Sequence, residues 1–280
     1  DVGRRISQDF TKQFGIRMEI LVGSGGTLKE KILVEQAMKH HVADVFSIGG
    51  ANSTSELVLR GGADGIAHEL PALKDKGVFK VDPVYSPNGE MVVWNQQYTA
   101  VVAINTKLVK SQEEPRSFKD LLDNRWKGQI ITGDPRVGGV TGVWYVLRYY
   151  GVLDLDYYRR LAQQDLKLWG GNIREAAAMV ARGEYLIGLN VPTSEVAPLI
   201  AEGAPLKILA FEEGVAGSPQ TILVVKGAPH PNAGRVFVNW LMSPEGQHSY
   251  VESSSATSVR KDVPDFVHPN ASVSPRKIWP

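Results

Sequence analysis

The chain has 280 residues, of which 43% are hydrophobic and 22% are charged, and its formal net charge is +1. This is the composition of an ordinary globular protein with room for two domains, and not of a disordered, collagen-like or coiled-coil chain. The near-neutral charge and the lack of any Lys/Arg run longer than two argue against a nucleic-acid partner. No apolar run approaches the ~20 residues that a transmembrane helix requires.

The sequence contains no cysteine, which excludes disulfides, thiolate metal ligands and thiol nucleophiles within it. The first ten residues are polar and typical of a helix, and they do not have the pattern of a signal peptide. We therefore expect a mature or trimmed chain, and the composition alone does not determine its compartment.

A short apolar strand, a Gly-rich turn and a capped helix follow one another repeatedly along the chain. Three of the expected helices begin with Ser, Thr or Asn followed three residues later by Glu, a spacing that satisfies free N–H groups at a helix start. These pairs are Thr27/Glu30, Ser53/Glu56 and Asn172/Glu175. The strand-and-turn segments are 17–26, 43–52, 128–139, 166–171 and 184–190, and the helices that follow them are 27–40, 53–62, 140–151, 172–184 and 191–203.

Strands that alternate with helices predict an α/β fold with mainly parallel strands. Two longer β-rich runs, 94–109 and 217–227, separate groups of these units, and we interpret them as strands that cross between two lobes. Lobe 1 is then expected over 1–100 and 219–280, and lobe 2 over 101–218. The segment 230–247 predicts two late helices, the second beginning at Ser243-Pro244 with proline in its first position.

The Gly-rich turns are the candidate ligand site, because ligands of open α/β sheets bind at the carboxyl ends of the strands. Free N–H groups at helix starts also attract anions. Glycine in such turns equally serves backbone freedom alone, so any single turn can be purely structural. Taken together, the turns and the neighbouring strand ends predict ligand contacts from Ser24, Gly25, Gly26, Thr27, Ser47, Asn52, Tyr98, Arg136, Gly138, Gly139, Val140, Thr141 and Asn190.

Several segments in the expected order resemble the family 1 extracellular solute-binding proteins of ABC transporters, in particular the branch that includes the ferric-binding proteins. They are 43–46, 104–109, 115–139, 183–190, 232–247 and 256–263. The resemblance implies the type 2 periplasmic-binding fold, in which two lobes close over a ligand by a hinge motion. Family members begin with a strand before the first helix, whereas this chain begins in the segment expected to form that helix, so either the chain lacks that strand or its start differs, and no ligand contact from the first strand-helix turn is assigned.

Within this family, the ferric-binding branch places two adjacent tyrosines after the strand that corresponds to 184–190. Here Val191, Pro192 and Thr193 occupy those positions, so we expect no tight binding of ferric iron and no metal site. The pairs Tyr149-Tyr150 and Tyr157-Tyr158 are expected to pack in or beside a helix. The aromatic residues Trp94, Trp144 and Trp169 are interpreted mainly as core residues that could also line a ligand cleft.

No sequence pattern of a nucleophile elbow, a zinc protease or a P-loop is present, so we expect no enzymatic activity. The resemblance predicts a periplasmic, monomeric trap without a cofactor, which captures a small anionic solute bearing a carboxylate or phosphoryl group and delivers it to an ABC permease in the cytoplasmic membrane. Two alternatives remain open: a ligand-sensing domain of the same fold, and a ferric-ion-binding protein with atypical ligands.

Overall fold

The computed structural model describes every residue of the chain except 1, 24, 50–51, 100, 137–140, 255, 274–275 and 280. The chain divides into two compact units. Unit 1 comprises residues 1–96 and 218–266, and unit 2 comprises residues 97–217 and 267–280. The expected lobes differ from these units at the boundary residues 97–100 and 218, and over residues 267–280, which were expected in lobe 1.

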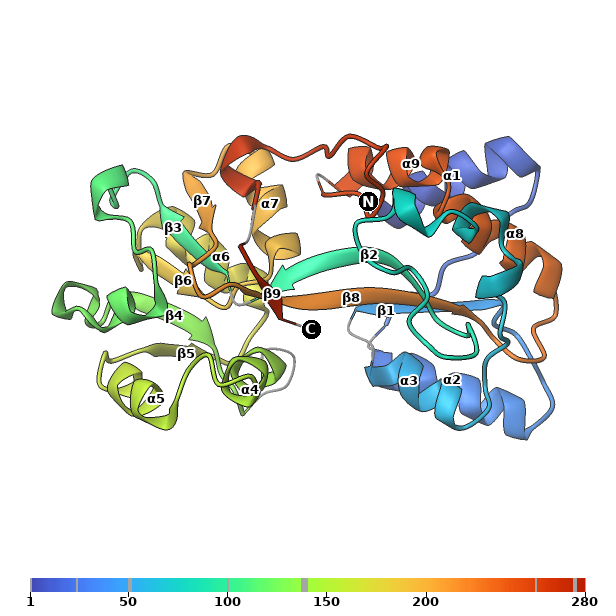
Figure 1. Ribbon diagram of the computed structural model, residues 1–280, viewed down its shortest axis with the longest axis horizontal. Helices are drawn as coiled ribbons and strands as arrows, with labels where there is room; N and C mark the ends of the chain where they lie inside the picture. The colour runs from blue at the N-terminus through green and yellow to red at the C-terminus, as the bar shows by residue number, and fades with distance from the viewer. Residues whose placement is uncertain are drawn as a thin grey trace. The chain divides into compact units, whose positions relative to one another are not determined.

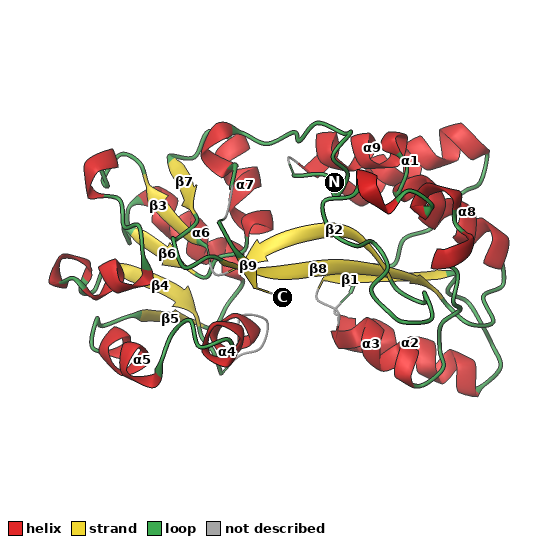
Figure 2. Ribbon diagram, viewed as in Figure 1, coloured by secondary structure: helices red, strands yellow, loops and turns green. Residues whose placement is uncertain are grey.

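Unit 1 contains a sheet with helices on both of its faces (Figures 1 and 2). Its strands follow the order β1-β8-β2, and β1 is antiparallel to β8. The helices and strands that lie in unit 1, or begin or end there, are α1 (Val2–Phe14), α2 (Gly25–Ala37), β1 (Val45–Gly49), α3 (Asn52–Leu59), β2 (Val92–Thr99), β8 (Val215–Val224), α8 (Pro231–Leu241) and α9 (Pro244–Ser254).

The alternation of side chains along the strands distributes the core of unit 1 over two faces of the sheet. On one face, Ile222 and Val224 of β8 pack with residues of α1, α8 and α9. On the other face, Leu223 packs with Phe46 of β1 and with Ile32 and Leu57 of α2 and α3. The sheet therefore holds the helix starts of α2 and α3 against the end of β1.

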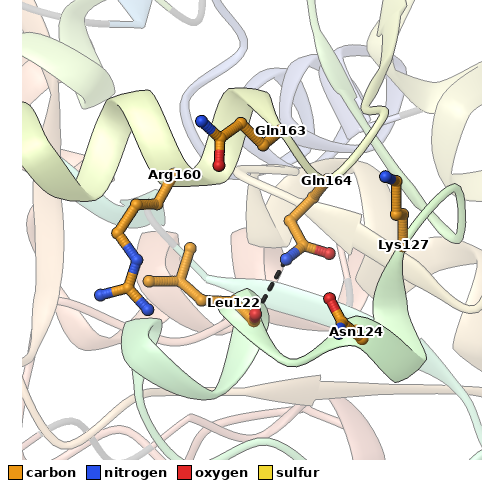
Figure 3. Close-up of a pocket in the computed structure, with 6 residues that line it drawn as sticks. All are labelled: Leu122, Asn124, Lys127, Arg160, Gln163 and Gln164. Carbon is orange, nitrogen blue, oxygen red and sulfur yellow. Dashed lines mark hydrogen bonds between the residues drawn. The ribbon is translucent and has the colours of Figure 1, made fainter.

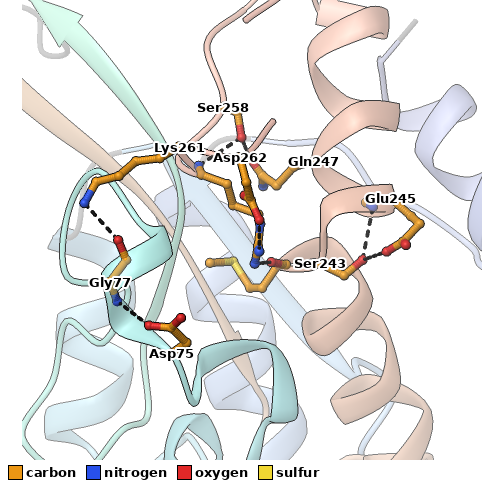
Figure 4. A network of polar contacts seen from close by, with 11 residues as sticks. Asp75, Gly77, Ser243, Glu245, Gln247, Ser258, Lys261 and Asp262 are labelled. Carbon is orange, nitrogen blue, oxygen red and sulfur yellow. Dashed lines mark hydrogen bonds and ion pairs between the residues drawn. The ribbon is translucent and has the colours of Figure 1, made fainter. Parts of the chain in front are cut away.

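The C-terminal part of unit 1 is fixed by the side chain of Gln247 on α9, which is completely buried (Figure 4). Its amide nitrogen donates to the carbonyl oxygens of Trp94 and Leu241, each at 3.0 Å. Its amide oxygen accepts from the Ser258 hydroxyl at 2.8 Å and from the Val259 N–H at 3.1 Å. The amide thus ties β2, the α8–α9 junction and the segment after α9 together.

Unit 2 contains a sheet of order β5-β4-β6-β3-β7. Strand β4 is parallel to β5 and β6, whereas β3 is antiparallel to β6 and β7. The elements lying wholly in unit 2 are β3 (Val102–Asn105), β4 (Ile130–Gly133), α4 (Thr141–Tyr149), α5 (Leu155–Ala162), β5 (Lys167–Trp169), α6 (Ile173–Arg182), β6 (Ile187–Leu189), α7 (Thr193–Ala201), β7 (Leu206–Leu209) and β9 (Ile278–Trp279).

Strands β3, β4 and β6 are buried along their whole length, because both faces of the unit 2 sheet are covered. Ile130 and Leu189 face a cluster that includes Leu147 of α4 and Leu161 of α5. Ile131 on the opposite face packs with residues of α6 and α7. This double coverage explains why the sequences of β3, β4 and β6 consist mostly of consecutive apolar residues.

The predicted caps of the helix at 172–184 are confirmed. The Asn172 side chain accepts from the N–H of Arg174 at 2.9 Å, and Gly183 ends α6 in the left-handed conformation with φ of 81°. Helix α9 begins at Pro244, as predicted. These ends depend on residues within one turn of each other, so the sequence alone locates them.

Two sequence-based expectations are wrong. Residues 17–23 do not form a strand in the structure, and Ile20, Leu21 and Val22 are largely exposed. The strands are also not mainly parallel. Strand β3 is antiparallel to both of its neighbours, β6 and β7, and β1 is antiparallel to the distant β8. Within the described residues, no helix combines the length and hydropathy needed to cross a membrane.

Candidate functional site

In unit 1, Gly25 brings two of the predicted turns together. It is the first residue of α2, and a Cβ atom at this position would lie 2.7 Å from Ile48 of β1 and 3.1 Å from the Ser53 hydroxyl of α3. Any larger residue would require the Ile48 side chain to shift. The start of α2, the end of β1 and the start of α3 therefore meet at one point, and both helix starts direct partial positive charge toward it.

An ion-pair bridge keeps α2 and α3 in this arrangement. Lys29 of α2 contacts the carboxylates of Glu56 on α3 and Glu30, the latter at 3.2 Å. Arg60 approaches the same Glu56 carboxylate at 2.8 Å. The expected Thr27/Glu30 capping box is not at the helix start, because α2 begins two residues earlier, at Gly25.

The other predicted contacts of unit 1 lie in the first turn of α2, within β1 and at the start of α3. Gly26 and Thr27 are exposed in the first turn of α2, and Gly26 has open space around its Cα. Ser47 is exposed in the middle of β1, on the side of the strand opposite to Ile48, and Asn52 is the first residue of α3. Ser24 lies outside the described residues. Unit 1 thus offers hydroxyls and helix N–H groups, which are donors for an anionic oxygen.

In unit 2, Arg136 follows β4 but is engaged by a carboxylate. Its Nε and Nη2 atoms lie 2.9 Å and 2.6 Å from the two carboxylate oxygens of Asp134, and its backbone N–H donates to the same group at 2.9 Å. The hydrogen bonds from Arg136 lower the pKa of Asp134 to about 2. Asp134 therefore offsets the positive charge of Arg136, which was expected to contact the ligand.

Further predicted contacts of unit 2 are only partly described. Tyr98 on β2 is half-buried, and its N–H lies 3.5 Å from the Thr193 hydroxyl at the start of α7. Thr141 is the first residue of α4. Gly138, Gly139 and Val140 lie outside the described residues, so the expected anion turn between β4 and α4 stays a prediction.

Asn190 directly follows β6 and is completely buried, with a left-handed backbone of φ 56°. Its N–H donates to the Val101 carbonyl at 3.0 Å. Neither polar atom of its side-chain amide has a hydrogen-bond partner. A buried polar group without a partner costs about 1–3 kcal/mol. The amide would gain from a ligand, but neighbouring groups would first have to move, because solvent does not reach it here.

A polar depression of about 280 Å³ lies elsewhere in unit 2 (Figure 3). The Gln164 amide donates to the Leu122 carbonyl at 2.8 Å along one of its walls. The lining residues precede β4 and β5 in the chain, so the depression is at the amino ends of these parallel strands. The residues that line the depression are Leu122, Asn124, Lys127, Arg160, Gln163 and Gln164. Open α/β sheets bind ligands at the other end of the strands.

Two polar groups at the strand ends could not be recognised in the sequence. Trp94 was interpreted mainly as a core residue, but its indole N–H donates to the Ser47 hydroxyl at 2.9 Å. Thr132 on β4 is buried and its hydroxyl has no hydrogen-bond partner. The expected packing of the tyrosine pairs is seen for Tyr157, which is buried, and for Tyr149, which stacks on Tyr145 within α4 although it is 67% exposed.

The sequence of the chain matches a known protein family. The sequence model of the family described as bacterial extracellular solute-binding protein matches residues 1–252. The chain belongs to this family. The resemblance inferred from short segments of the sequence is therefore confirmed over nearly the whole chain.

This solute-binding protein also has identifiable relatives. It is 25% identical over 262 residues to a Salmonella typhi periplasmic protein provisionally named as 2-aminoethylphosphonate-binding, a match that covers 91% of this chain and 73% of the relative. Its fold is similar to fructose-6-phosphate-bound AfuA of Actinobacillus pleuropneumoniae, with a TM-score of 0.74, 20% identity and coverage of 94% and 83% of the two chains. Iron-bound HitA of Pseudomonas aeruginosa gives a TM-score of 0.77, 20% identity and coverage of 98% and 87%. The expected fold, that of the periplasmic binding proteins, is thereby confirmed.

Proposed function

We propose that this solute-binding protein captures a small anionic solute in the periplasm and delivers it, as a monomer, to an ABC permease. The observation that carries the proposal is the family match over residues 1–252. The relative named for 2-aminoethylphosphonate supports a phosphonate or a related oxyanion as the solute. In this proposal the two units act as lobes that close on the solute about β2 and β8.

The chemistry of unit 1 supports an anionic group on the solute. The starts of α2 and α3 meet beside Gly25, and the exposed groups there are hydroxyls and helix N–H groups. Such groups donate to carboxylate or phosphonate oxygens without carrying a full charge themselves. In unit 2, Asp134 already engages Arg136, so the proposed anion site depends on neutral donors more than on arginine.

The alternatives have less support. A ferric-ion-binding role requires several hard anionic ligands, and no group of three or more His, Cys, Asp or Glu in the described part of the chain is placed to hold a metal. A ligand-sensing domain would share the fold and the solute chemistry. It differs in its partner, so stimulation of a reconstituted ABC permease by the loaded protein would separate the two roles.

A thermal-denaturation screen tests the proposal. We expect 2-aminoethylphosphonate, methylphosphonate or inorganic phosphate to raise the melting temperature, whereas glucose at the same concentration does not. A solute at 100 times its Kd stabilises a protein by about 2.7 kcal/mol, which corresponds to roughly 5–10 °C at this chain length. If glucose or ferric citrate stabilises the protein and none of the anions does, the proposed solute class is wrong.

A further inference from the structure

The chain passes between the two units three times. Two of the passages lie inside strands, at residues 96–97 of β2 and at residues 217–218 of β8. The third passage lies at residues 266–267, after α9. The sequence predicts the first two from their long β-rich runs, whereas the third lies in a segment without a regular pattern.

The chain is fixed to unit 1 as far as Phe266. The carboxylate of Asp265 accepts hydrogen bonds from the Lys80 ammonium group at 2.8 and 3.0 Å. It also accepts from the Ser258 N–H at 2.8 Å. The next N–H along the chain, that of Phe266, donates to the Ala256 carbonyl at 3.2 Å. All of these partners belong to unit 1, so the chain is held there up to the passage itself.

The chain is fixed to unit 2 from Val267 onward. The Val267 side chain packs against the buried cluster that includes residues of α6 and α7, and Ala271 is 5% exposed within the same cluster. The N–H groups of Ala271 and Ser272 donate to the His268 carbonyl at 2.8 and 3.0 Å. Farther along, β9 pairs in parallel with residues 215–216 of β8. The described residues after the passage are thus part of the packed structure of unit 2.

The third passage therefore has no slack. Phe266 and Val267 are held by different units, and consecutive Cα atoms lie about 3.8 Å apart in every conformation. Two strands alone would allow the units to bend and twist about these strands. A third short connection permits only those rotations that leave it unstretched.

We infer that residues 265–268 form a tether that limits how far the two units open. The tether narrows the range of open arrangements, so it reduces the conformational entropy that is lost when the units close on a solute. A longer connection should therefore widen the open state. The inference rests on the hinge motion of the proposed function, but it does not depend on the class of solute.

Spin labels on Gln8→Cys and Asp156→Cys test the tether by double electron–electron resonance. Both residues are exposed, one in each unit, and the absence of natural cysteine makes the two labels specific. Insertion of six Gly/Ser residues between Phe266 and Val267 adds a flexible span of about 13 Å. We expect the distribution of distances between the labels to widen by several ångströms in the solute-free protein.

The same insertion between Gly203 and Ala204 is the matched control, because this turn joins α7 to β7 within unit 2. It should leave the distribution unchanged. Asp265→Asn covers the case in which the tether insertion prevents folding. This change weakens the ion pair with Lys80 without adding residues, so it should widen the distribution by a smaller amount.

An unchanged distribution in the folded insertion variant would overturn the inference, and so would equal widening by the control insertion. If the insertion variant does not fold, an unchanged distribution in Asp265→Asn has the same meaning. Addition of 2-aminoethylphosphonate to the wild-type protein separates the tether from the proposed function. If this solute leaves the wild-type distribution unchanged while the tether insertion widens it, the proposed solute is wrong and the tether stands.

Discussion

Replacement of Gly246 by alanine should lower the free energy of unfolding of unit 1 by about 3 kcal/mol, the upper part of the range for overpacked sites. A Cβ atom at this position would collide with the Trp240 carbonyl oxygen and would lie 2.7 Å from the Leu241 Cα atom. Both obstacles are backbone, so the α8–α9 junction would have to shift. A loss of this size corresponds to a fall in melting temperature of roughly 10 °C.

Gly26→Ala is the matched control for this prediction. Gly26 also lies in a helix, α2, but nothing surrounds the position of its missing Cβ atom. Since alanine favours helices by up to about 1 kcal/mol over glycine, Gly26→Ala should be neutral or slightly stabilising. Differential scanning calorimetry of both variants measures the two changes in melting temperature. A Gly246→Ala protein as stable as the wild type would mean that α8 and α9 do not approach as closely as described.

Replacement of Gln247 by leucine is expected to cost about 3–5 kcal/mol, although leucine is of similar size and more hydrophobic. The change leaves the Trp94 and Leu241 carbonyls, the Val259 N–H and the Ser258 hydroxyl without their shared partner in a buried place. Each group left unsatisfied in the interior costs about 1–3 kcal/mol, and some of them will find other partners after relaxation.

Urea denaturation measures this loss, with Gln8→Leu as the control. Gln8 is on the exposed side of α1, so the same change of side chain should alter the stability by less than about 0.5 kcal/mol. If Gln247→Leu were as stable as Gln8→Leu, the buried amide would not be the link between β2, the helix junction and the segment after α9.

The features that could be predicted from the sequence depend on neighbouring residues. The cap at Asn172, the glycine stop at Gly183 and the start of α9 at Pro244 are each determined within one helical turn, and the structure has them where the sequence places them. The family was likewise recognisable, because several short segments occur in the right order. The predicted ligand contacts stay predictions.

The features that escaped prediction depend on distant parts of the chain. Residues 17–23 have the alternation of a strand, but a strand forms only where a partner lies beside it, and the described residues provide none. The bond from Trp94 to Ser47 spans a sheet whose strand order is not encoded locally. The pairing of Arg136 with Asp134 is local, but a charged pair two residues apart has no fixed geometry until its turn is folded.

The central claim is that this protein recognises a negative charge on its solute, and calorimetry on matched acids and derivatives that lack the anionic group tests it most directly. The pairs are 2-aminoethylphosphonate with its diethyl ester and 3-aminopropanoate with its primary amide, the second pair being nearly equal in size. Loss of two charge-assisted hydrogen bonds of about 1.5 kcal/mol each weakens binding roughly 100-fold. In each pair whose acid binds, we predict that the derivative without the anionic group binds at least this much more weakly. Equal affinity of an acid and this derivative would contradict the account.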